Sequence, residues 1–131
     1  MNGESQLTLE SFERGDVDAG SFDHEAHVYI AWLYISRYDL RGATERFSAA
    51  LKLLTRKLGV PQKYHATLTQ FWMHLIAERT ARDPEADWTT FRQRNQDLFR
   101  DAKAFLRNYY TDELLASKEA RLRFTEPDKQ H

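Results

Sequence analysis

The residues best suited to chemistry in this chain are three histidines. His24 and His27 stand three positions apart in a predicted helix, so their side chains point the same way. His65 falls on the core-facing side of a later predicted helix, and short links make consecutive helices neighbours. Three neutral imidazoles with an open fourth position form a catalytic zinc arrangement, and imidazole also suits copper, iron and nickel. We therefore expect His24, His27 and His65 to be ligands of a divalent transition metal such as zinc.

Residues 64–69, with the sequence Tyr-His-Ala-Thr-Leu-Thr, open a predicted buried helix in an unusually polar way. A histidine and two threonines lower helix propensity and put polar groups in the core, so something must satisfy them. In an enzyme, His65 would act as general base or metal ligand, and Tyr64 would orient the substrate. The candidate contacts to a small ligand on the same helix are Thr67, Thr69 and Trp72.

Each histidine also has a purely structural interpretation. His27 would pack against Phe22 as the apolar pair that flanks a helix start, with His24 in solvent. His65 would be a core histidine whose ring bonds to a backbone carbonyl. The known helical metal motifs are absent, because His24 and His27 are one residue short of the zinc-protease spacing and no Glu-x-x-His pair exists. Both interpretations stay open at this stage.

Composition excludes several other kinds of chemistry. The sequence has no cysteine, which rules out disulfides, thiolate catalysis and Cys-ligated metal sites. It also has no Gly-rich phosphate loop and no Gly-x-Ser-x-Gly motif, so nucleotide and serine-hydrolase chemistry has no support.

Charge and hydropathy bear on partners and location. The 131 residues carry a net charge of -1, so no general attraction to nucleic acid is expected. The longest apolar run, residues 28–35, is far shorter than the roughly 20 residues of a membrane span. The acidic first twenty residues lack the apolar block of a secretory signal. We expect a cytoplasmic protein without nucleic-acid or membrane partners.

Helices must position the candidate residues, because apolar residues recur with a helical period and no segment alternates like a strand. Asp23 suits the start of a helix that runs to about residue 38 and is apolar on nearly all sides. Asp39 suits the start of a second, which Gly59 ends. Pro61 suits the first position of a third helix, running to about Arg82.

The remaining residues predict one more long helix and two short ones. The long one runs from Asp83 or Asp87 to about residue 107, and short turns begin near residues 111 and 117. We therefore predict an all-α fold, a compact antiparallel helical bundle of four main helices plus one or two short C-terminal helices. It forms a single domain over residues 21–131, after an irregular arm over residues 1–20. Of the residues in the arm, we expect only Leu9 and Phe12 to contribute to the core of the domain.

The first predicted hairpin resembles one tetratricopeptide unit. The residues that carry the resemblance stand at the spacings by which that motif packs its two helices, and they are Ala31, Tyr34, Ala43, Phe47 and Ala50. The closing proline comes about six residues late, and a second unit does not follow. The resemblance implies one helical hairpin packed by similar rules and no solenoid, because repeats need neighbours to bury their faces.

Three segments further resemble a group of small all-helical bacterial proteins. They are His24-x-x-His27 before Ala31-Trp32, Lys63-Tyr64-His65-x-Thr67-x-Thr69, and Leu115-x-Ser117-x-x-Ala120-Arg121 leading to Glu126-Pro127-Asp128. The resemblance spans residues 22–128 and implies no particular reaction. It adds Arg121 to the candidate ligand contacts, and it suggests that Arg121, Glu126 and Asp128 fold back over the bundle mouth. The alternative is that residues 126–128 form a polar tail with a turn.

Two functions follow from these residues. The first is an internal pocket of His, Tyr and Thr side chains that binds a small molecule or a divalent metal and could catalyse a reaction. The second is a tetratricopeptide-like module that docks a peptide or a second copy of itself as a homodimer, with structural histidines. Metal analysis of tag-free purified protein and of its His65→Ala variant separates the two: stoichiometric metal that is lost in the variant supports the first hypothesis, and the absence of metal and ligand leaves the second.

Overall fold

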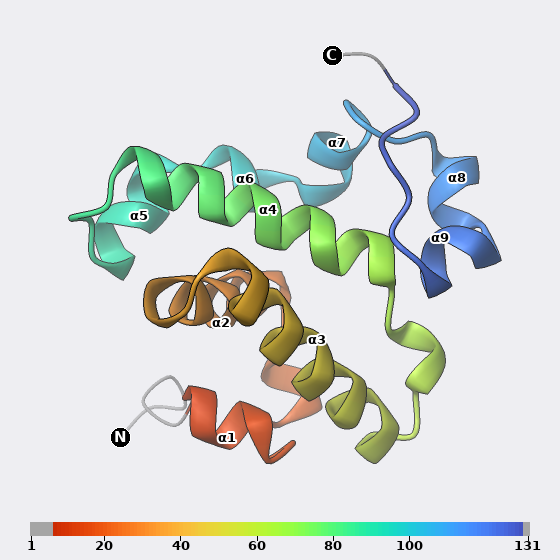
Figure 1. Cartoon of the computed structure of the whole chain (residues 1–131), viewed down its shortest axis with the longest axis horizontal. Helices are drawn as coiled ribbons and strands as arrows, with labels where there is room; N and C mark the ends of the chain where they lie inside the picture. The colour runs from red at the N-terminus through yellow and green to blue at the C-terminus, as the bar shows by residue number, and fades with distance from the viewer. Residues whose placement is uncertain (1–6, 130–131) are drawn as a thin grey trace. The chain divides into compact units, whose positions relative to one another are not determined.

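The computed structural model describes residues 7–129, and it is all-helical as predicted, with no strand among those residues. The chain divides into two compact units, Met1–Tyr64 and His65–His131, which are described in turn (Figure 1). The first unit holds α1 (Leu9–Glu13), η2 (Ala19–Ser21), α2 (His24–Arg37), α3 (Leu40–Lys57) and η3 (Pro61–Lys63). The second holds α4 (Ala66–Arg82), α5 (Trp88–Arg94), α6 (Asp97–Arg100), α7 (Ala102–Leu106), α8 (Asp112–Ala116) and α9 (Lys118–Leu122).

The helices of the first unit begin and end where local chemistry predicts. The Asp23 carboxylate accepts from the Ala26 N–H at 2.9 Å to start α2, and Asp39 caps α3 in the same way. Beyond the end of α3, Gly59 has φ of 76°, the left-handed conformation that glycine adopts most readily. Two of the expected helix starts and one stop are thereby confirmed.

The core of the first unit is aromatic. The Phe12 ring stacks on Phe47 with 5.5 Å between ring centroids, and Tyr34 meets Phe47 edge-on at 5.9 Å. The Tyr34 hydroxyl donates to the Glu13 carboxylate at 2.9 Å, so this buried phenol is satisfied. Helices α1, α2 and α3 therefore pack together around these rings.

Helix α1 corrects the expectation of an irregular arm over residues 1–20. A reciprocal pair of bonds between Thr8 and Ser11 starts this helix, since each side chain accepts from the other's backbone N–H. Such a short helix has little stability alone. Its fully buried Phe12 and nearly buried Leu9 hold it against the unit, which agrees with the core contribution expected of these two residues.

The third predicted helix begins later than expected. Pro61 opens only the short η3 turn, and Tyr64 is extended with φ of -65° and ψ of 132°. Helix α4 starts at Ala66 with His65 as its N-cap. His65 therefore lies just before the helix and not on its core-facing side, a difference that decides what its ring can do.

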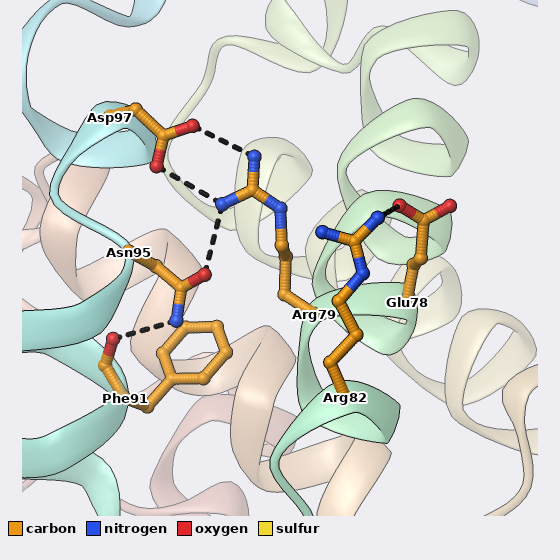
Figure 2. A network of polar contacts seen from close by, with 6 residues as sticks. All are labelled: Glu78, Arg79, Arg82, Phe91, Asn95 and Asp97. Atoms are coloured by element: carbon orange, nitrogen blue, oxygen red, sulfur yellow. Dashed lines mark hydrogen bonds and ion pairs between the residues drawn. The ribbon is translucent and has the colours of Figure 1, made fainter.

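The predicted fourth helix is three short helices, broken at Asn95 and Asp101. The Asn95 amide donates to the Phe91 carbonyl at 2.9 Å and accepts from the Arg79 guanidinium at 2.9 Å. Figure 2 shows that guanidinium also reaching both carboxylate oxygens of Asp97, at 3.0 and 2.8 Å. Asp101 is extended and its side chain starts α7. Side-chain bonds thus replace the backbone bonds that a continuous helix would make.

Aromatic residues also hold the second unit together. Trp72 of α4 stacks on Phe105 of α7 with 5.8 Å between ring centroids, and Phe71 contacts Tyr109 and Tyr110. Helix α4 also packs against α9. The N-terminal turns of α4 are therefore surrounded by elements from the end of the chain.

Candidate functional site

The ring of His65 is occupied at both nitrogens. Its Nδ1 accepts from the backbone N–H of Leu68 at 3.1 Å, which requires that nitrogen to be unprotonated. In the neutral ring the proton is then on Nε2, which lies 2.8 Å from the Leu115 carbonyl oxygen and donates to it. In this arrangement neither nitrogen offers a lone pair to a metal ion or to a substrate proton.

The two threonines are satisfied inside the second unit as well. The Thr67 side chain is fully buried, and its hydroxyl lies 2.6 Å from the Ala120 carbonyl and 3.0 Å from the Arg123 carbonyl. A hydroxyl has one proton, so the shorter contact takes most of it. The same oxygen accepts from the Thr125 N–H at 3.0 Å. The Thr69 hydroxyl donates to the His65 carbonyl at 2.7 Å. The polar start of α4 therefore has partners for each of its side chains.

The other candidate ligand contacts serve packing or lie elsewhere. Trp72 is 4% exposed and lies between aromatic rings. Arg121 lies on α9 and is partly buried. Tyr64 belongs to the first unit, where the Lys52 ammonium sits 5.2 Å from its ring centroid. The proposed pairing of Tyr64 with His65 in catalysis stays a prediction.

His24 and His27 lie in the first turn of α2. The His27 ring meets Phe22 at 5.9 Å and Phe47 at 5.1 Å between centroids, both edge-on. The structural interpretation of His27 predicted its contact with Phe22, and that contact is confirmed. Burial in this apolar setting, together with the smaller effect of neighbouring His24, lowers the pKa of His27 to about 4. His27 is therefore neutral at physiological pH.

The structure brings only part of the predicted site together. His65, Thr67 and Thr69 lie in one cluster, and all three bond within the second unit. His24 and His27 belong to the first unit, so their predicted approach to His65 stays a prediction. Across residues 7–129, no group of three or more His, Asp or Glu side chains is arranged to hold a metal ion.

Sequence reasoning missed the partners at the end of the chain. The Asp128 carboxylate accepts from the backbone N–H of Thr111 at 2.9 Å and from its hydroxyl at 2.7 Å. These bonds lower the pKa of Asp128. The Tyr110 hydroxyl donates to the Thr125 carbonyl at 2.7 Å, and burial, with Glu126 and Asp128 nearby, raises the pKa of Tyr110 to about 12. Asp128 thus bonds a residue 17 positions earlier in the chain, and nothing in the sequence pattern pointed to Tyr110.

A second feature is the solvent face of α3. Its residues Arg41, Glu45, Lys52 and Arg56 are exposed, and at 100° per residue they fall within a 60° sector of the helix. The basic stripe is defined as Arg41, Lys52 and Arg56. Among residues 7–129, neither Arg41 nor Arg56 has an ion-pair partner. The stripe therefore presents positive charge to solvent in a chain whose net charge is only -1.

The fold and these side chains define a small all-helical protein with a satisfied polar cluster and a basic helix face. Comparison with protein-family models, curated proteins and solved structures finds no match to this chain. Within residues 7–129, none of the helices combines the length and the apolar character that crossing a membrane requires.

Proposed function

We propose that this protein is an interaction module that binds an acidic segment of a partner along α3. The observation that carries the proposal is the basic stripe, because its three exposed cations outnumber Glu45, the one carboxylate in the same sector, and so attract carboxylates of a partner. Glu45 is the only acidic residue of α3. The resemblance of the α2–α3 hairpin to a tetratricopeptide unit is consistent with this kind of role.

The occupied ring of His65 supports an interaction role over a catalytic one. A general base or a metal ligand needs an available nitrogen lone pair, and both nitrogens of His65 are engaged with backbone groups. The buried hydroxyl of Thr67 is engaged too. The residues that suggested an internal pocket thus have a structural use.

The test is binding of a fluorescently labelled peptide of about twelve alternating Asp and Glu residues, followed by anisotropy. We expect saturable binding that weakens as salt is raised, since exposed charges are screened over about 8 Å at 0.15 M ionic strength. The double variant Arg41→Glu, Arg56→Glu should bind about tenfold or more weakly, which corresponds to roughly 1.4 kcal/mol.

A matched control separates the effect of losing the basic stripe from the effect of changing the net charge. Lys103 and Lys118 are also exposed on helices, so Lys103→Glu with Lys118→Glu changes the net charge equally. This control should bind the acidic peptide within about twofold of wild type. Equal loss in both double variants, or no saturable binding to wild type, would contradict the proposal. A wild-type dimer that dissociates only in the stripe variant would identify the partner as a second copy.

A further inference from the structure

The C-terminal residues 123–129, here called the tail segment, lie along the second unit as an extended peptide. Arg123 has φ of -141° and ψ of 149°, and the chain stays non-helical to Lys129. Figure 1 shows this stretch in dark blue after α9. Apart from Thr125, every residue of the tail segment is exposed. Its apolar contact is the stacking of the Phe124 ring on His74, with 6.4 Å between ring centroids, and hydrogen bonds and an ion pair add to it.

Two buried hydroxyls bind the backbone of one tail residue. The Thr67 hydroxyl accepts the Thr125 N–H at 3.0 Å, and the Tyr110 hydroxyl donates to the Thr125 carbonyl at 2.7 Å. Neither contact uses the Thr125 side chain, whose hydroxyl donates to the Arg123 carbonyl. Recognition through the main chain supplies affinity for an extended peptide without selecting the side chain at that position.

The carboxylate of Asp128, three residues after Thr125, supplies the selectivity for an acidic residue. Asp128 accepts two hydrogen bonds from Thr111, one from its N–H and one from its hydroxyl. The Lys129 N–H then donates to the Tyr109 carbonyl at 3.0 Å. Pro127, directly before the carboxylate, restricts the peptide to an extended approach. Charge-assisted bonds at a fixed spacing distinguish an acidic residue from a neutral one.

The receiving groups are defined as the tail seat, which consists of Thr67, Tyr109, Tyr110 and Thr111. Thr67 and Tyr110 are fully buried. The Tyr110 hydroxyl donates to the Thr125 carbonyl of the tail segment, whereas the Thr67 hydroxyl donates to Ala120 of α9 and accepts from the tail segment through the Thr125 N–H. A buried polar group left without a partner costs free energy. The seat is therefore built to hold an extended peptide backbone, and the tail segment meets that requirement within the same chain.

We propose that the tail seat is a peptide-binding site for an extended segment of another chain. The backbone of one residue in that segment bonds the Thr67 and Tyr110 hydroxyls, and the segment carries a carboxylate three residues later. The chain's own tail segment occupies the site and competes with that partner. The chemistry of the occupant is defined by the tail segment itself, which shows both the backbone and the carboxylate contacts. This inference is independent of the basic stripe, because the tail seat lies wholly in the second unit.

The experiment uses the full chain with Asp128→Ala, which weakens the competing tail segment and leaves the seat intact. The probe is a labelled synthetic peptide with the sequence of residues 122–129, Leu-Arg-Phe-Thr-Glu-Pro-Asp-Lys. We expect saturable binding by anisotropy, at least about tenfold tighter to the variant than to wild type, because the attached tail segment is at high effective concentration. Circular dichroism checks that the variant is folded.

Two altered peptides test the recognition rule. A peptide with Asp128→Ala should lose binding by about tenfold or more, because it lacks the carboxylate for Thr111. A peptide with Thr125→Ala should bind like the parent, because that residue is held through its backbone. Thr111→Val, added to the Asp128→Ala chain, should weaken the parent peptide by removing one donor. No saturable binding to the Asp128→Ala chain, or equal binding of the parent and Asp128→Ala peptides, overturns the proposal.

Discussion

At the scale of single residues, His27 and His65 act through their uncharged rings. His65 joins the first turn of α4 to the Leu115 carbonyl, and His27 packs between Phe22 and Phe47. Both roles need a neutral imidazole, since a cation would lose the Nδ1 acceptor of His65 or bury charge at His27. Histidine is used here for shape and hydrogen bonding.

The lowered pKa of His27 predicts a pH dependence of stability. The unfolded chain binds a proton at a pKa near 6.5, whereas the folded chain does so only near 4. The free energy of unfolding should therefore decrease as pH falls from about 6.5 to 4, by at most about 1.4 kcal/mol per pH unit from this group. Above pH 6.5 and below pH 4 its contribution should be constant.

The measurement is denaturant unfolding from pH 7.5 to 4 of wild type and of His27→Phe. The variant keeps an aromatic ring of similar size and cannot titrate, so the difference between the two proteins isolates His27 from the carboxylates. If the difference in unfolding free energy between wild type and His27→Phe does not change with pH, His27 is hydrated in the folded protein.

At the scale of elements, tertiary contacts decide where helices exist. Helix α1 is only five residues long, yet Phe12 stacks on both Phe22 and Phe47. Residues 88–106 have a helical apolar pattern, yet Asn95 and Asp101 interrupt them. Contacts of Phe12 with distant residues thus stabilise a helix that is too short to form alone, whereas a bond from Arg79, 16 positions away, accompanies the break at Asn95.

Phe12→Ala should lower the free energy of unfolding by roughly 3–5 kcal/mol, because it removes a fully buried ring from the core of the first unit. Phe124→Ala is the matched control, since that ring is 37% exposed, and it should cost less than about 1 kcal/mol. Chemical denaturation of both variants measures the difference. Equal, small losses would mean that α1 is not part of the core.

At the scale of the whole molecule, the metal hypothesis and the interaction hypothesis predict different metal contents for the purified protein. With both nitrogens of His65 engaged, we expect protein purified without a tag to retain well below one equivalent of zinc. His65→Ala should leave that metal content unchanged and lower the unfolding midpoint, because it removes the cap of α4 and the bond to Leu115. Elemental analysis by mass spectrometry provides the measurement. Stoichiometric metal that is lost in His65→Ala would instead restore the predicted His24, His27 and His65 site.

Residue types and their spacing were enough to predict the all-helical class and the helix ends of the first unit. Asp23 and Asp39 start helices, Gly59 ends one, and Phe22 pairs with His27, all through interactions between residues at most five positions apart. Such contacts are set by helix geometry, so a pattern of residue types is enough to predict them.

The roles of the polar residues depend on contacts between positions far apart in the chain. The His65 ring bonds a carbonyl 50 positions away, and Thr67 bonds the backbone 53 to 58 positions away. The same residue types suit a metal site or a structural cluster, and the choice depends on which groups the folded chain brings to them. Because carbonyls occur at every residue, no sequence pattern marks the ones at Leu115, Ala120 and Arg123 as partners.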